Sequence, residues 1–237
     1  MRYALYFSPA ADHPLTKTAS RWLGRDAFTG EAFATPDVAG LSAEEVHALT
    51  ADPRRYAFHA TLKAPFELAE GRSEAELIMA FEQFAATTQA FEIPNVIVGQ
   101  LGRFFALVPD QVYPDLQAFA ARIVEDFEPF RAPLSDTDIA RRKPDTLSPE
   151  HRANLMRWGY PHVMDEFRFH MTLSGQVPPE QEPAMRAALE PRFAEFINKP
   201  LSIDGIALFV EPARGADFIA HRRLPLKPAL ETRKTAS

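Results

Sequence analysis

Cysteine is absent from this sequence of 237 residues. The absence excludes disulfides and thiolate metal sites, and it fits a reducing compartment, so we expect a cytoplasmic protein. Long apolar runs are lacking too, since no stretch approaches the roughly 20 apolar residues of a membrane span. Pro9 and Asp12 interrupt the first apolar run too early for a signal peptide. We therefore expect no membrane partner.

The sequence also has no excess of positive charge. The sequence has 26 Lys and Arg against 32 Asp and Glu, which gives a formal net charge of −6. Proteins that bind a long polyanion usually present a basic surface, so we do not expect long RNA or DNA as a partner. A small anionic ligand is compatible with this charge, because a few local cations suffice to bind it. The oligomeric state is not indicated.

Local signals predict a mixture of helices and strands. Ser42 and Ser73 each stand three residues before a glutamate, the spacing of a capping box at a helix start. We expect helices at 14–24, 42–51, 73–85, 114–127, 149–158 and 183–197. We expect strands at 2–7, 91–98, 104–108, 201–210 and 217–222, and irregular chain at 25–40 and 128–148.

One short motif occurs twice. Residues 58–62 read Phe-His-Ala-Thr-Leu, and residues 169–173 read Phe-His-Met-Thr-Leu. Each copy is apolar and rich in strand-favouring residues, so each predicts a β-strand. Because side chains alternate along a strand, the histidine and threonine of each copy face the same side, and its phenylalanine and leucine face a core.

The order of elements around the motif repeats as well. In each half a helix, a loop, the motif strand, a long helix and a hairpin follow one another. The pattern predicts an α+β fold made by duplication, with two antiparallel sheets and flanking helices around a central cleft. We expect a single bilobal domain with lobes at 1–110 and 111–225 and a flexible tail at 226–237.

The paired motifs resemble those of the 2H phosphoesterase superfamily. Residues 2–7, 58–66, 158–161 and 167–173 are similar to the branch tied to phosphonate breakdown, a domain-of-unknown-function family. The resemblance implies a bilobal fold and cleavage of cyclic phosphodiesters without metal or other cofactor. It implies four active residues, His59, Thr61, His170 and Thr172. For this branch it suggests 5-phosphoribosyl 1,2-cyclic phosphate as substrate.

The chemistry of phosphodiester cleavage also indicates these residue types, independently of the family resemblance. Opening a cyclic phosphodiester needs a base for water and an acid for the leaving oxygen, and imidazole serves as either near neutral pH. The hydroxyls of Thr61 and Thr172 are suited to hold the charged phosphate oxygens. Which histidine is the base does not follow from a nearly symmetric sequence. Further candidates for substrate contact share a strand face with the motifs: Lys63, Arg168, Tyr6, Arg2 and Ser174.

Other functions fit parts of the same pattern. An RNA-end processing enzyme or 2′,5′-RNA ligase-like member of the superfamily would use the same motifs. A non-catalytic module that binds a nucleotide would keep the fold, although intact histidines in both halves disfavour it. A metallohydrolase is disfavoured, because no His-x-His or His-Glu-x-x-His spacing occurs. We expect a small anionic cyclic phosphate as the partner.

Overall fold

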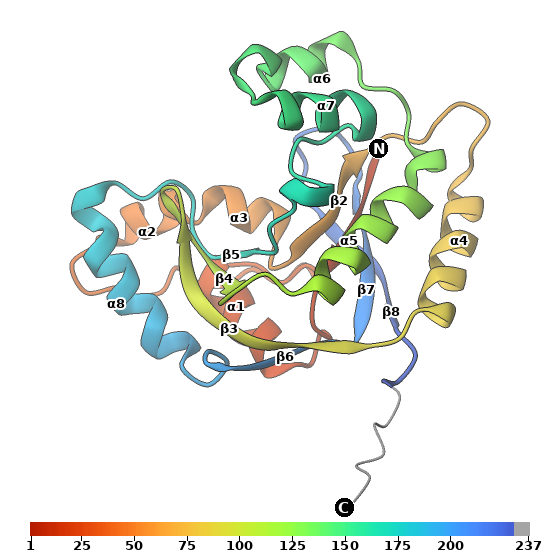
Figure 1. Cartoon of the computed structure of the whole chain (residues 1–237). Helices are drawn as coiled ribbons and strands as arrows, with labels where there is room; N and C mark the ends of the chain where they lie inside the picture. Colours follow the sequence, from red (N-terminus) through yellow and green to blue (C-terminus); the bar gives the residue numbers. More distant parts are fainter. Residues whose placement is uncertain (230–237) are drawn as a thin grey trace, which may run out of the picture.

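In the computed structural model, which describes residues 1–229, the strands form one antiparallel sheet (Figure 1). Its strand order is β6-β3-β4-β5-β2-β1-β7-β8. The strands are β1 (Arg2–Phe7), β2 (Ala60–Phe66), β3 (Phe91–Leu101), β4 (Phe104–Pro109), β5 (Met171–Thr172), β6 (Lys199–Ile203), β7 (Gly205–Glu211) and β8 (Ile219–Pro225). The predicted α+β class is confirmed.

Two separate sheets were predicted, and the structure joins them into one. The link is the short strand β5, in which Met171 pairs with Ala60 of β2 and Thr172 pairs with Ala106 of β4. Both halves of the chain supply strands to both ends of the sheet, because β1 pairs with β7 and β3 pairs with β6. The expected lobes 1–110 and 111–225 therefore do not correspond to separate groups of strands.

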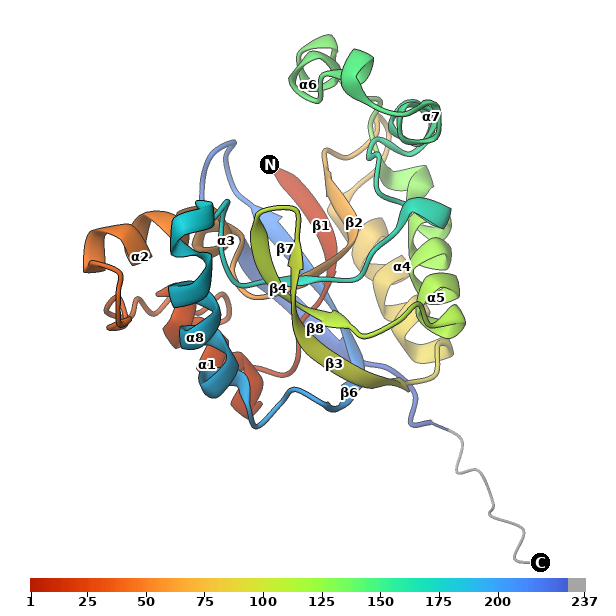
Figure 2. The same cartoon turned by 60° about the vertical axis from the view of Figure 1, so that its left-hand side comes forward.

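Pairs of helices cover the sheet from two sides (Figure 2). In the view of Figure 2, α1 and α8 lie on one side and α4 and α5 on the other, and α6 and α7 stand apart above the strands. The helices are α1 (Pro14–Leu23), α2 (Ala43–Leu49), α3 (Ala51–Tyr56), α4 (Glu74–Thr87), α5 (Pro114–Asp126), α6 (Asp136–Arg141), α7 (Pro149–Trp158) and α8 (Glu182–Phe193). Among the described residues, none of these helices combines the length and the apolar character needed to cross a membrane.

The helix starts predicted at Ser42 and Ser73 are confirmed. Both capping boxes form, with the Ser73 hydroxyl accepting from the backbone of Glu76 at 3.3 Å and the Glu76 carboxylate accepting in return at 2.8 Å. Gly159 ends α7 in the left-handed conformation, with φ of 74°. The predicted helix 42–51 is α2, and a second helix, α3, follows it directly and contains Pro53 in its first turn, where the missing N–H costs no helical bond.

Three expectations from the sequence are wrong in part. The predicted strand 201–210 is interrupted at Asp204, where the chain passes from β6 to β7 and from one region of the sheet to another. The predicted irregular segment 128–148 contains α6. The predicted tail begins with ordered residues, since Leu226 is buried and donates to the Asp204 carbonyl at 2.8 Å. The rest of that tail, 230–237, lies outside the described residues.

The core fixes the two motifs at the centre of the sheet. Phe58 and Phe169 are 3% and 4% exposed, and both belong to the main apolar cluster. Phe7 lies against Phe169, with ring centroids 6.0 Å apart. Burying such a side chain contributes about 1.5–3 kcal/mol, so the phenylalanine of each motif anchors the histidine that follows it.

Candidate active site

A cavity of about 460 Å³ lies where the two motif strands meet. His59 and Thr61 line it from the start of β2, and Thr172 lines it from β5. Each histidine is the last residue before its strand, because both strands begin two positions later than the motifs at 58–62 and 169–173 predict. His170 lies beside the cavity, against Phe104 of its wall, at a ring-centroid distance of 5.6 Å.

The two imidazoles are held by the same device. His59 Nδ1 lies 2.9 Å from the carbonyl of Ala57, and His170 Nδ1 lies 2.7 Å from the carbonyl of Arg168. A carbonyl only accepts, so each Nδ1 carries a proton and donates it. In a neutral imidazole Nε2 is then the free basic nitrogen. His59 Nε2 lies 3.2 Å from the Thr61 hydroxyl, which donates to it.

The environments of the two imidazoles differ. Burial lowers the pKa of His59 from 6.5 to about 4, and repulsion from His170 adds to the effect. Burial also lowers the pKa of His170, by a smaller amount. The Tyr6 ring stacks on His59 with a centroid distance of 3.8 Å and an interplanar angle of 20°. This stacking explains why His59 is only 9% exposed.

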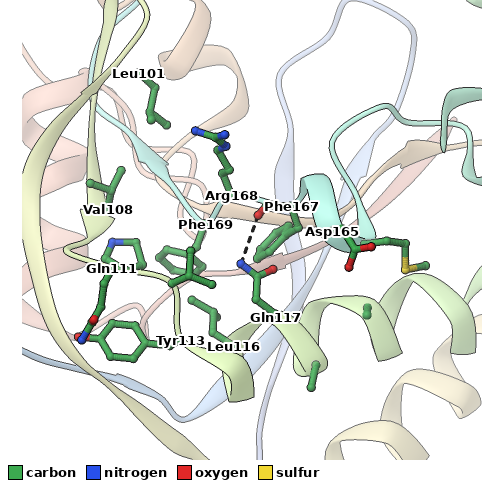
Figure 3. Close-up of a pocket in the computed structure, with 15 residues that line it drawn as sticks. Leu101, Val108, Gln111, Tyr113, Leu116, Gln117, Asp165, Phe167, Arg168 and Phe169 are labelled. Atoms are coloured by element: carbon green, nitrogen blue, oxygen red, sulfur yellow. Dashed lines mark hydrogen bonds between the residues drawn. The ribbon is translucent and has the colours of Figure 1, made fainter. Parts of the chain in front are cut away.

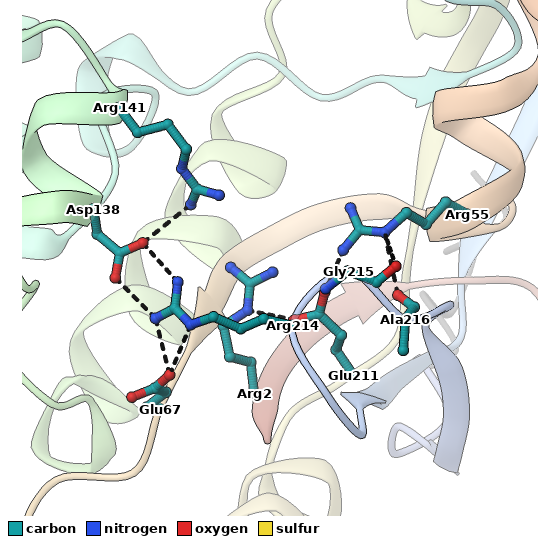
Figure 4. Close-up of polar contacts among 9 residues, drawn as sticks. All are labelled: Arg2, Arg55, Glu67, Asp138, Arg141, Glu211, Arg214, Gly215 and Ala216. Atoms are coloured by element: carbon teal, nitrogen blue, oxygen red, sulfur yellow. Dashed lines mark hydrogen bonds and ion pairs between the residues drawn. The ribbon is translucent and has the colours of Figure 1, made fainter.

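Arg2 and Tyr6 reach the cavity, as the alternation of β1 predicts. Arg2 is 7% exposed, and its Nε donates to the Glu211 carboxylate at 2.5 Å (Figure 4). Glu211 also accepts from Arg55 and from the backbone of Gly215. The guanidinium of Arg2 is thus oriented through one nitrogen by a fully buried carboxylate. A role of Arg2 and Tyr6 in binding substrate stays a prediction.

Lys63 does not reach the cavity, although strand alternation places it beside His59 and Thr61. Between Thr61 and Lys63 the β1–β2 register shifts, so that Tyr6 pairs with Thr61 but Leu5 pairs with Lys63. This bulge turns Lys63 to the opposite face of the sheet. There its ammonium donates to the Val124 carbonyl at 2.9 Å and to Glu128 at 2.8 Å.

Arg168 and Ser174 also differ from expectation. Arg168 lines a second cavity, of about 750 Å³, beside Phe167 and Phe169 (Figure 3). Ser174 lies at the first cavity but is fully buried. Its hydroxyl accepts from the Phe105 backbone at 2.9 Å and donates to the Gly175 carbonyl at 2.9 Å, so it holds the end of the motif to β4.

Sequence reasoning missed several residues of the cavity wall. Arg141 and Arg142 line the cavity from the end of α6, inside the segment expected to be irregular. Tyr56 and Tyr160 line it as well. The sequence around Arg141 and Arg142 shows no clear strand or helix pattern, so nothing in it indicated that they reach the cavity. Tyr160 lies in residues 158–161, one of the segments that carry the family resemblance. Among residues 1–229 no group of three His, Asp or Glu side chains is placed to hold a metal ion.

Comparisons with known proteins found relatives over most of the chain. Two relatives carry the description "Ribose 1,5-bisphosphate phosphokinase PhnN". The one from Janthinobacterium sp. (strain Marseille) is 37% identical over 228 residues, which cover 94% of this chain and 50% of the relative. The one from Laribacter hongkongensis (strain HLHK9) is 34% identical over 220 residues, covering 92% and 50%. The chain spans about half the length of these relatives.

A solved structure and a protein family also match. The crystal structure of E. coli LigT complexed with ATP covers 95% of this chain and 98% of LigT, with 16% identity and a TM-score of 0.41. The family described as "Protein of unknown function (DUF1045)" matches residues 61–219, a range that includes Thr61, His170 and Thr172. This match extends over more than half of the chain, and the chain therefore belongs to that family.

Proposed function

We propose that this chain is a cyclic phosphodiesterase that hydrolyses a small cyclic phosphate without a metal ion. The observation that carries the proposal is the pairing of Ala60 with Met171, which brings the two His-x-Thr segments side by side at the cavity. Two imidazoles, each held through Nδ1 by a backbone carbonyl, and two hydroxyls supply proton transfer and charge stabilisation at that point.

The reaction balances with these groups alone. A neutral imidazole takes a proton from water as its oxygen attacks phosphorus, and one phosphorus–oxygen bond of the ring breaks. A protonated imidazole gives its proton to the leaving oxygen, so a cyclic diester and water yield a phosphomonoester with a free hydroxyl. With substrate bound, the Thr61 hydroxyl turns from His59 Nε2 toward the phosphate. It then donates, together with the Thr172 hydroxyl, to the non-bridging oxygens, whose charge grows in the transition state.

The substrate we propose is 5-phosphoribosyl 1,2-cyclic phosphate, in phosphonate degradation. The relatives support a phosphorylated ribose, since their description names an enzyme that acts on ribose 1,5-bisphosphate. The cavity, at about 460 Å³, has a size typical of small-ligand sites. No long groove is needed for such a substrate, in keeping with the net charge of −6.

A substrate panel tests this function. The purified protein is incubated with 5-phosphoribosyl 1,2-cyclic phosphate, 2′,3′-cyclic nucleotides and ADP-ribose cyclic phosphate, and products are followed by phosphorus NMR. We expect the ring signal of the ribose substrate to be replaced by a phosphomonoester signal. The His59→Ala variant controls for contaminating activity. Preferred turnover of RNA-derived cyclic ends would assign the chain to RNA processing, and binding without turnover would make it a non-catalytic module.

A further inference from the structure

Three arginines lie together at one end of the cavity. Arg2, Arg141 and Arg142 line the cavity and also a smaller neighbouring pocket, whereas His59, Thr61 and Thr172 line the cavity only. The three arginines, here called the arginine end, are therefore set apart from the motif residues but open into the same space. A single small ligand in the cavity can contact both.

Arg142 has the least engaged guanidinium of the three. Arg141 pairs with Asp138 at 3.2 Å, and Arg2 pairs with Glu211 through Nε. Arg142 Nε is buried without a hydrogen-bond partner among the described residues. The guanidinium carbon of Arg142 lies 5.0 Å from the centroid of the Tyr160 ring, which holds the side chain at the cavity wall.

The charge at this wall is one-sided. Among the cavity-lining residues of the described chain, Asp52 is the only acid, against the three arginines. Arg2 and Arg141 already have carboxylate partners, and the Arg141 side chain is 59% exposed, whereas no carboxylate among the described residues pairs with Arg142. A partly buried cation without a counter-charge is costly, so a bound anion would stabilise Arg142. Burial raises the pKa of the Tyr160 phenol, which keeps it protonated as a further hydrogen-bond donor.

We propose that the arginine end, with Tyr160, binds a second anionic group of the substrate, a terminal phosphomonoester remote from the cyclic phosphate. This inference rests on the proposed function and narrows its substrate class to cyclic phosphodiesters that carry such a group. A guanidinium donates two parallel hydrogen bonds to phosphate oxygens, which suits Arg142 better than a lysine for this task.

The test compares two substrates that share the ring. The ratio of kcat/KM for 5-phosphoribosyl 1,2-cyclic phosphate to that for its dephosphorylated analogue is measured for wild type, Arg142→Met and Arg142→Lys. We expect Arg142→Met to lower this ratio by about 10–100-fold, and Arg142→Lys to lower it less. The control is Arg152→Met on α7, whose side chain is 58% exposed and should leave the ratio unchanged. An unchanged ratio in folded Arg142→Met overturns the proposal.

A binding measurement separates this proposal from the proposed function. Ribose 5-phosphate, which has no ring ester, is titrated into wild type, Arg142→Met and His170→Ala by calorimetry. We expect Arg142→Met to weaken its binding by about 10–100-fold and His170→Ala to preserve it. If Arg142→Met weakens binding of ribose 5-phosphate but no cyclic phosphate is turned over, the cyclic phosphodiesterase function is refuted and the anion site is supported. If a cyclic phosphate is turned over but Arg142→Met leaves binding of ribose 5-phosphate unchanged, the function is supported and the anion site is refuted.

Discussion

At the scale of single residues, each imidazole is oriented by a carbonyl two positions earlier in the chain. The bonds from His59 to Ala57 and from His170 to Arg168 need no partner from elsewhere in the fold. The orientation is therefore built into the motif itself. Burial is not, since Tyr6 covers His59 and Phe104 packs against His170. The two copies differ through these neighbours.

Removing either imidazole should nearly abolish turnover. We expect His59→Ala and His170→Ala each to lower kcat by about 10²–10⁴-fold, the usual effect of losing a general acid or base. His221→Ala is the matched control, because its side chain is 41% exposed on β8 and its Nε2 lies 3.6 Å from Glu74, outside the cavity lining. Thermal unfolding verifies that all three variants fold. Near-normal turnover by either motif variant would contradict catalysis by two histidines.

The pH profile should reflect the lowered pKa values. The proposed reaction needs one neutral and one protonated imidazole, so kcat/KM should rise near the lower pKa of the pair and fall near the higher. With the pKa of His59 lowered to about 4 and that of His170 lowered from 6.5, both limbs lie below pH 6.5. A bound anionic substrate raises both pKa values, so the kcat optimum should lie at higher pH than that of kcat/KM. A kcat/KM optimum above pH 7 would be inconsistent with this account.

At the scale of elements, one bulge in β2 changes the role of Lys63. Its side chain is 3% exposed, and its ammonium forms a mostly buried ion pair with Glu128 on the face away from the cavity. We expect Lys63→Met to lower the free energy of unfolding by roughly 1–3 kcal/mol, measured by urea denaturation. Adding Glu128→Gln should recover part of the loss. A change in selectivity between phosphorylated and dephosphorylated substrates would instead place Lys63 at the site.

A second prediction concerns the segment that carries α6 and Arg142. Arg214, in the turn between β7 and β8, donates to Asp138 of α6 at 2.8 Å and to Glu67 at 2.9 Å (Figure 4). We expect Arg214→Ala to speed hydrogen exchange in residues 133–160 by about 3–10-fold and to raise KM, because half-exposed ion pairs contribute modestly. Arg122→Ala on α5 is the control. We call these contacts of Arg214 with Asp138 and Glu67 the tether of α6. Unchanged hydrogen exchange in residues 133–160 of Arg214→Ala would refute it.

The same tether should respond to pH. The Arg214 guanidinium lowers the pKa of the Asp138 carboxyl well below its usual range. A carboxyl with a lowered pKa stabilises the folded state above its ordinary pKa, about 3.9, and loses that contribution as the pH falls. The difference in exchange between wild type and Arg214→Ala should therefore be present at pH 7 and shrink below about pH 4. A difference that grew on acidification would contradict this sign.

Features that depend on neighbouring residues can be predicted from this sequence, and features that depend on contacts between distant parts of the chain cannot. Ser42, Ser73 and Gly159 mark helix ends correctly, because a cap depends on residues within one turn. The bulge before Lys63 depends on pairing with β1, some sixty positions away, and no local signal announces it. Arg142 was missed for the same reason, since its place at the cavity depends on the packing of α6 and Tyr160.

At the scale of the whole molecule, the proposed reaction uses side chains for both proton transfer and charge stabilisation, without a metal ion. We therefore expect activity to survive exhaustive treatment with EDTA. The measurement compares kcat/KM before and after treatment, with added zinc or manganese as a control. Loss with EDTA and recovery with metal would favour the metallohydrolase alternative.

The exchange of strands between the halves also sets how the protein folds during synthesis. β1 pairs with β7, and the bond from Arg2 to Glu211 spans 209 positions of the chain. β2 covers one edge of β1 early, but at about 5–20 residues per second the ribosome makes β7, the partner on the other edge, roughly 10–40 s after β1 itself. For that time the apolar strand at residues 2–7 has an open edge, a state that favours association with other chains. The nascent chain should therefore depend on chaperones until its last hairpin emerges.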